Sequence, residues 1–153
     1  MPDIVLYQPD IPQNTGTILR LGACLGVAVH LIEPAGFTLS DKGLKRAGMD
    51  YLELAALRRH ISWDQFNAWR TDQGRRLVLL TTAADTAYTD FDFGAEDLLM
   101  VGRESAGVPD AVHSACDARL TIPMAAGARS LNVATAAAMV IGEALRQVGS
   151  MSS

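Results

Sequence analysis

The stretch that decides the fold is residues 98–147, which contains LLMVGRESAGVPD at 98–110 and ARLTIPMAAGARSLNVATAAAMVIGEALRQ at 118–147. Two short apolar runs, Leu98–Val101 and Arg119–Ile122, each end in a loop of glycine and small residues. The alanine-rich segment that follows predicts a helix over Leu131–Gln147. Because ligands of parallel α/β proteins bind at the carboxyl ends of the strands, this order predicts a ligand site at the two loops.

Outward from this stretch, the N-terminal part of the chain predicts a strand, a helix and a second strand. Ile4–Tyr7 is a short β-type run, and Asn14 or Thr15 is placed to cap the helix that follows. Gly26 is placed to end that helix, and Val27–Ile32 is the next strand. A βαβ unit of about 30 residues makes the two strands parallel.

The middle of the chain is less clearly patterned. Asp41 is a candidate cap for a short basic helix over Lys42–Ala47, and Tyr51–Leu54 is interpreted as a strand inside an ambiguous segment. Ser62, with Gln65 three residues later, has the pattern of a capping box that opens a helix to about Thr71.

Three aromatic residues, Trp63, Phe66 and Trp69, share one face of that helix. They are either a stacking platform for nucleic-acid bases or the face that pins the helix to the sheet, and the second reading is favoured.

The remaining elements complete one α/β domain over residues 1–153, with a tail at 149–153 expected to be disordered. Leu77–Leu80 predicts a buried strand, Ala83–Glu96 a short helix and loop, and Pro109–Ala115 a helix. The predicted architecture is a mostly parallel sheet with helices on both faces.

Composition excludes several classes of protein. About half of the 153 residues (49%) are hydrophobic, which excludes a disordered chain, and no apolar run approaches the roughly 20 residues of a membrane span. The N-terminus has no basic region of a secretory signal, so a cytoplasmic protein is expected. Cys24 and Cys116 are predicted to be buried, reduced thiols rather than a disulfide or metal site.

Common catalytic signatures are absent from the sequence. There is no GxSxG, no P-loop and no GxGxxG, which disfavours a nucleotide-dependent oxidoreductase. His30, His60 and His113 lie in unrelated contexts without metal-ligand spacing, so no metal is expected.

Charge alone does not decide between nucleic-acid binding and a solvated surface. The formal net charge is −4, yet basic residues cluster at Lys42, Lys45 and Arg46 and again at 58–60. Arg20 lies among apolar neighbours in its helix, and Glu104 lies in a glycine-bounded loop. Arg20 is either a snorkelling surface arginine or a functional one. Glu104 is a solvated loop charge, an anchor for local backbone N–H groups, or a functional residue.

Three motifs then identify a resemblance. NTGTILRLGACLG, the VGRESAGVP loop and IPMAAGARSLNVATAAA resemble, in order and spacing, the motifs of the SPOUT RNA 2′-O-methyltransferases. The N-terminal IVLYQPDIPQNTGTILRL, with HLIEPAGF and LKRAGMDY, is most similar to the small bacterial subgroup that methylates the wobble cytidine or uridine of tRNA. The resemblance covers the chain to about Gln147.

The resemblance implies a fold, a cofactor and a set of site residues. It implies a C-terminal deep trefoil knot that binds S-adenosylmethionine, no metal, and a homodimer acting on the tRNA anticodon stem-loop, with leucine tRNAs expected. It places Arg20 and Asn14 at the catalytic centre, and Glu104 and Asn132 at the loops and reacting end. Lys45, Arg46 and Arg129 are expected to bind substrate. The expected lining of the donor pocket is Leu80, Thr81, Gly102, Ile122, Met124, Ser130 and Leu131.

Two departures and two alternatives accompany this hypothesis. Relatives commonly have serine at the position of Ala134, and often proline at the position of Arg103. The alternatives are a 2′-O-methyltransferase for another tRNA or rRNA site, and a non-catalytic RNA-binding module on the same fold.

Overall fold

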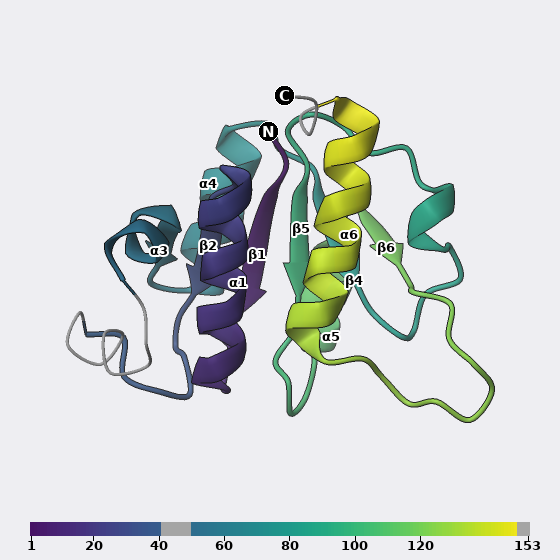
Figure 1. The fold of residues 1–153 in the computed structure, drawn as a ribbon, viewed down its shortest axis with the longest axis horizontal. Helices are drawn as coiled ribbons and strands as arrows, with labels where there is room; N and C mark the ends of the chain where they lie inside the picture. The colour runs from purple at the N-terminus through teal and green to yellow at the C-terminus, as the bar shows by residue number, and fades with distance from the viewer. Residues whose placement is uncertain (41–49, 150–153) are drawn as a thin grey trace.

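The structure, a computed structural model, describes residues 1–40 and 50–149. Within these ranges one six-stranded sheet has the order β3-β2-β1-β5-β4-β6, and each neighbouring pair is parallel (Figure 1). The strands are β1 (Asp3–Tyr7), β2 (Val29–Ile32), β3 (Leu57–His60), β4 (Leu77–Leu80), β5 (Leu98–Val101) and β6 (Ala118–Leu120). The predicted α/β class with a parallel sheet is confirmed.

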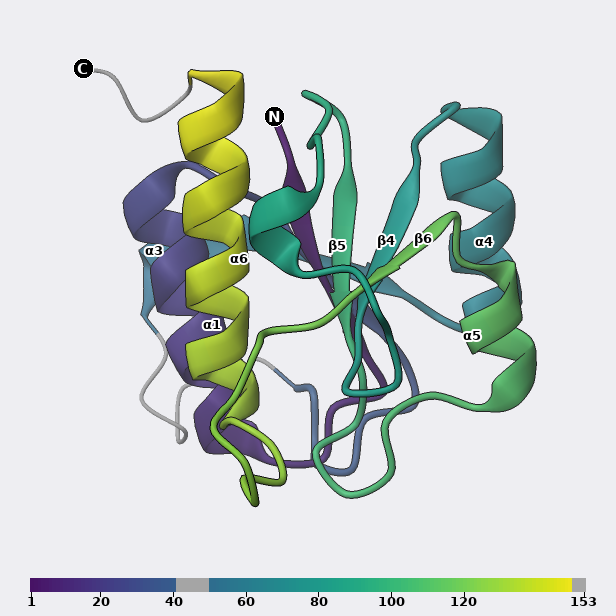
Figure 2. The same cartoon turned by 90° about the vertical axis from the view of Figure 1, so that its right-hand side faces the viewer.

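Helices cover both faces of the sheet, as predicted. Figure 2 shows α1 and α6 on one face and α4 and α5 on the other. Both faces of a parallel sheet are buried, and the helices supply the apolar surface that packs against each face. The helical elements are α1 (Pro12–Leu25), α3 (Tyr51–Ala56), α4 (Trp63–Asp72), the 3₁₀ turn η1 (Tyr88–Asp90), α5 (Asp110–Ala115) and α6 (Val133–Val148).

The two faces have separate cores because strand side chains alternate in direction. On β1, Ile4 and Leu6 pack into the cluster under α1 and α6. Val5 and Tyr7 point the other way, into the cluster around Phe66 of α4. Every residue of β1, β2 and β5 is buried, which is why these strands have almost no polar alternation.

Helix α1 begins and ends differently from the sequence-based expectation. The predicted cap at Asn14 or Thr15 is wrong, because Ile11 is the N-cap residue and Pro12 occupies the first turn. No side chain caps the helix; proline removes one N–H that needs a partner and presets the helical backbone angle. Gly26 ends the helix at φ 69°, as predicted, and its N–H bonds Gly22 O.

The predicted strand at Tyr51–Leu54 is wrong, because this segment begins helix α3. The strand of this region is β3, whose four residues include three basic ones and have the exposure pattern of a sheet edge rather than of a core strand. The predicted basic helix over Lys42–Ala47 and its cap Asp41 lie outside the described residues. Ser62 caps α4 as predicted, accepting a 3.1 Å hydrogen bond from Gln65 N.

The aromatic face of α4 pins this helix to the sheet, as favoured from the sequence. Phe66 is fully buried, and Trp63 meets Tyr7 edge-on at 6.3 Å between ring centroids. Trp69 packs against His30 and His60, with ring centroids 5.0 and 5.1 Å apart.

The expectation that the histidines are unrelated is wrong for His30 and His60. Pairing of β2 with β3 brings His30 Nδ1 within 3.0 Å of His60 Nε2, and His30 Nε2 lies 2.9 Å from Asp3 Oδ2. No group of histidine, cysteine and acidic side chains in the described residues has the arrangement of a metal site.

The two thiols differ. Cys116 is buried, and desolvation raises its thiol pKa to about 11, which makes it unreactive. The prediction that Cys24 is buried is wrong, because its position on α1 faces outward.

None of the helices within 1–40 and 50–149 is both long and apolar enough to cross a bilayer.

The histidine pair predicts how stability depends on pH. Desolvation, and then the charge of His30, lower the pKa of His60 from 6.5 to about 4. Between these values the unfolded chain binds a proton that the folded chain rejects, so the free energy of unfolding should fall as pH drops from about 6.5 to about 4. His60→Gln should reduce this slope in urea titrations across that range. An unchanged slope would contradict the role assigned to His60.

Candidate active site

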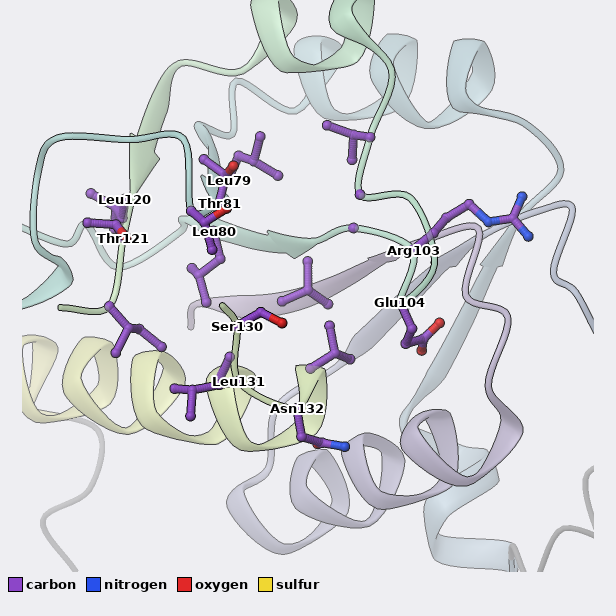
Figure 3. A pocket seen from close by; sticks show the side chains of 18 of the residues that line it. Leu79, Leu80, Thr81, Arg103, Glu104, Leu120, Thr121, Ser130, Leu131 and Asn132 are labelled. Carbon is purple, nitrogen blue, oxygen red and sulfur yellow. The ribbon is translucent and has the colours of Figure 1, made fainter. Parts of the chain in front are cut away.

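A pocket of about 470 Å³ opens at the carboxyl ends of β4, β5 and β6. Its walls come from the end of β4, the loop after β5, and the segment that links β6 to α6 (Figure 3). A volume of this size suits a ligand as large as a nucleoside. The pocket therefore lies at the same strand-end loops that the sequence pointed to.

The structure brings together most of the predicted site residues. Asn14, Glu104 and Asn132 line this pocket, whereas Arg20 and Arg129 do not. The residues expected around a methyl donor all line it: Leu80, Thr81, Gly102, Ile122, Met124, Ser130 and Leu131.

The loop after β5 is closed on itself through backbone groups. Arg103 N donates to Gly107 O at 2.9 Å, and Gly107 N donates to Arg103 O at 2.8 Å. A Cβ on Gly102 would lie 2.7 Å from both the Cα and the carbonyl carbon of Gly107, so no side chain fits there. Gly107 has φ 65°, which also favours glycine. The two glycines thus allow a tight ring that exposes backbone atoms to the pocket.

Asn132 joins the two helices beside the pocket. Its Oδ1 accepts hydrogen bonds from Ala134 N (2.8 Å) and Thr135 N (3.1 Å), which caps α6. Its Nδ2 donates to Asn14 Oδ1 of α1 at 3.0 Å. Figure 3 shows this side chain pointing from the start of α6 toward α1. Ala134 takes part through its backbone, so the lack of a hydroxyl at this position does not affect the cap.

Glu104 is a half-buried carboxyl at the wall of the pocket. Its Oε2 accepts a 2.9 Å hydrogen bond from Asp10 N, which ties the loop after β5 to the loop after β1. Desolvation, and then a hydrogen bond with the Asp10 carboxyl, raise the pKa of Glu104 above its usual value of 4.5.

Arg20 lies outside the pocket of its own chain. Its Nε donates to Glu53 Oε1 at 2.5 Å; the arginine side chain is 65% exposed and that of Glu53 only 5%. The hydrogen bond and the charge of Glu53 raise the pKa of Arg20 further above its already high usual value, so this guanidinium stays protonated. A single chain therefore does not place Arg20 beside the pocket.

Of the predicted substrate contacts, the structure describes only Arg129, which does not line the pocket. Arg129 is exposed in the loop between β6 and α6, and it forms no ion pair with another described residue. Lys45 and Arg46 lie outside the described residues. Arg103 lines the pocket mouth, but its guanidinium points away from the labelled leucine and threonine side chains (Figure 3).

Sequence reasoning missed Asp10, Ile11 and Glu53, among other residues of this region. Asp10 and Ile11 follow β1, whose carboxyl end lies at the same edge of the sheet as those of β4 and β5, so strand-end logic could have included them. Glu53, which holds Arg20, is distant in sequence and comes from a segment interpreted as a strand. No local signal marked it.

Fold and site together define the class: a parallel α/β protein whose ligand pocket is built from strand-end loops and the start of the last helix. The family model described as "SpoU rRNA Methylase family" matches residues 2–142. The chain belongs to this methyltransferase family.

Three similar proteins agree with that assignment. A tRNA (cytidine(34)-2'-O)-methyltransferase of Beijerinckia indica is 63% identical over 148 residues, which is 97% of this chain and 92% of the relative. A solved structure concerned with "the 2-OH methylation of C/U34 on tRNA" has a TM-score of 0.88 at 40% identity and covers 97% of each chain. AviRb of Streptomyces viridochromogenes, solved in complex with AdoMet, has a TM-score of 0.84 at 30% identity, covering 97% of this chain and 60% of AviRb.

The closed loop predicts the effect of Gly102→Ala. The added Cβ meets backbone rather than a movable side chain, so the loop must open and the pocket wall must shift. We expect at least a tenfold loss of affinity for the pocket ligand, measured by calorimetry with S-adenosylhomocysteine. Gly94→Ala is the matched control, since its Cβ would meet only the side-chain carboxylate of Asp97, with Oδ1 nearest at 3.4 Å. Equal affinity in the two variants would contradict this account of the loop.

Proposed function

We propose that this protein transfers a methyl group from S-adenosylmethionine to the ribose 2′-hydroxyl of the wobble nucleotide, position 34, of tRNA. The observation that carries the proposal is the strand-end pocket, found in a chain whose relatives are named for this reaction. The substrate nucleotide is cytidine or a modified uridine, in leucine tRNAs, and the setting is the cytoplasm.

The pocket residues fit this methyl donor. Leu80, Ile122 and Leu131 supply apolar surface for a flat base, and the glycine at 102 lets backbone donors and acceptors approach its edge. When bound, the donor supplies a methyl group on a positively charged sulfur. Asn14, Glu104 and Asn132 line the same pocket and would fix the reacting end.

The pocket is proposed to be the inside of a deep trefoil knot. Thr121, just after β6, donates to Thr86 O at 2.8 Å and accepts from Tyr88 N at 2.9 Å, so it is held by the loop that follows β4. The chain then returns across the sheet, and α6 packs against α1, β1 and β5. A return of the C-terminal segment past a preceding loop is the arrangement that a knot requires.

The active unit is proposed to be a homodimer, because one chain leaves its pocket without Arg20. The outer surfaces of α1 and α6 are adjacent and carry exposed small or apolar residues, including Cys24, Ala138 and Met139. A second copy packed on these helices would bring its Arg20 to the pocket mouth. There the permanently charged guanidinium would bind the RNA phosphate, orient the ribose and stabilise charge on the 2′-oxygen.

Arg20→Ala should abolish methyl transfer and leave the affinity for S-adenosylhomocysteine within about twofold, because Arg20 is outside the pocket of its own chain. A pocket-filling variant, Thr81→Trp, should lose donor affinity as well as activity. Co-expression of the two inactive variants should restore activity to roughly a quarter of wild type, since half of the random dimers contain one complete site. No recovery in isolated mixed dimers would contradict a site shared between chains.

Substrate binding is proposed to use Lys45, Arg46 and Arg129. Reversing the charge of the first two, as Lys45→Glu with Arg46→Glu, should weaken tRNA binding by about tenfold or more at ~0.1 M salt and lower the salt dependence. Arg146→Glu is the control, because Arg146 is already paired with Glu143 at the far end of α6. Filter-binding titrations at several salt concentrations measure both effects, and unchanged affinity would remove these residues from the proposal.

The function itself is tested by mapping ribose methylation. Total tRNA from a strain lacking the gene is incubated with the protein and isotopically labelled S-adenosylmethionine, and nuclease fragments are analysed by mass spectrometry. We expect one label on the ribose of nucleotide 34. A label on another tRNA or rRNA nucleotide would support the alternative methyltransferase, and binding without any label would support a non-catalytic module.

A further inference from the structure

Asp10 lies where three chain segments meet beside the pocket. It follows the carboxyl end of β1, and the loop at 103–105 lies against it from the end of β5. Gly36, in the loop after β2, is the third segment and packs against Asp10. Its backbone N donates to Pro9 O at 2.8 Å. Asp10 does not itself line the pocket, whereas its neighbour Glu104 does.

Asp10 contacts each residue of the 103–105 loop. Its backbone N donates to Glu104 Oε2 at 2.9 Å, and its Oδ2 accepts a short hydrogen bond from Ser105 Oγ. The same Oδ2 lies 3.5 Å from Arg103 Nη2. One residue thus binds the Glu104 carboxyl directly and fixes the loop on both sides of it.

The carboxyls of Asp10 and Glu104 influence each other. Asp10 Oδ1 is buried and has no hydrogen-bond partner among the described residues. Hydrogen bonds from Glu104 and Ser105 lower the pKa of Asp10 to about 2, while the pKa of Glu104 is raised. Each carboxyl therefore shifts the pKa of the other, Asp10 downward and Glu104 upward. The only other charged group at this junction in the described chain is Arg103.

We propose that Asp10 is a positioning residue of the methyl-transfer site, which acts by holding the Glu104 carboxyl in place at the pocket wall through contacts to residues 103–105. This inference rests on the proposed function of the pocket. Asp10 touches neither the donor nor the ribose; its effect passes through Glu104. Loss of this support moves a polar group at the reacting end, where small displacements have large effects on rate.

The first test is Asp10→Asn, which keeps the shape of the side chain and removes its charge. We expect kcat to fall roughly 10- to 100-fold, with KM for tRNA and the thermal midpoint close to wild type. Asp72→Asn is the matched control, since Asp72 is an exposed aspartate at the end of α4. A lowered thermal midpoint with unchanged kcat would mean that Asp10 only supports the fold, and would overturn the proposal.

The second test reads Glu104 without relying on activity. The δ-carbon of ¹³C-labelled Glu104, assigned by its absence in Glu104→Gln, is titrated by NMR. In Asp10→Asn the amide can donate to an ionised Glu104, so the midpoint of its titration should move to lower pH. An unmoved midpoint overturns the proposal. Wild-type protein that methylates no tRNA would refute the proposed function, while the NMR titration would still test the contact.

The third test leaves Asp10 intact. A Cβ at Gly36 would lie 2.7 Å from Asp10 Cβ and 3.0 Å from Asp10 Cα, so Gly36→Ala must displace Asp10. We expect it to reproduce the kcat loss of Asp10→Asn. Removing the Ser105 hydroxyl as Ser105→Ala should have a smaller effect in the Asp10→Asn background than in wild type. Wild-type kcat in Gly36→Ala, or fully additive losses in the double variant, would count against Asp10.

Discussion

The side-chain amide of Asn132 is the interaction on which the site depends. Its oxygen caps α6 and its nitrogen bonds Asn14 of α1, so both ends of one amide are used. The cap satisfies two N–H groups at the start of α6 that would otherwise need water, a contribution of about 1 kcal/mol. The hydrogen bond to Asn14 adds little to the free energy of unfolding, but it fixes where α6 starts relative to α1. The floor of the pocket is built on that junction.

The remaining walls follow from the parallel sheet. Because the strands are parallel, their carboxyl ends lie at one edge of the sheet. The loops after β1, β4, β5 and β6 therefore lie close together as a result of strand pairing alone. What the sheet does not supply is loop shape. The backbone ring closed by Arg103 and Gly107, and the hydrogen bond from Asp10 N to the Glu104 carboxyl, fix that shape.

The sequence predicted best what depends on local pattern. The strands Leu77–Leu80 and Leu98–Val101 are uninterrupted apolar runs, and the structure has them at the same residues. The prediction from sequence failed where contacts with distant segments determine the structure. Tyr51–Leu54 is helical, and His30 meets His60 only because β2 pairs with β3. The pocket loops could be placed because they follow strand ends, and the individual lining residues because their motifs resemble those of a known family.

Arg20 shows a different limit of the sequence. Its motif associates it with the catalytic centre, but the fold directs it to Glu53 and outward from its own pocket. No reading of one chain decides where an outward arginine acts, since that depends on what packs against it. The same holds for Glu53, which is buried only because α3 lies against α1.

The edge strand β3 has a consequence for solubility. An outer strand of a parallel sheet has one row of backbone N–H and C=O groups without a sheet partner, and such a row can pair with the edge of another molecule. Here that row belongs to a strand of four residues, in which Arg58 and Arg59 are exposed. Two identical edges brought together would place like charges side by side and would have few residues to pair. The arginines thus disfavour edge-to-edge pairing at β3, independently of any part they have in binding RNA.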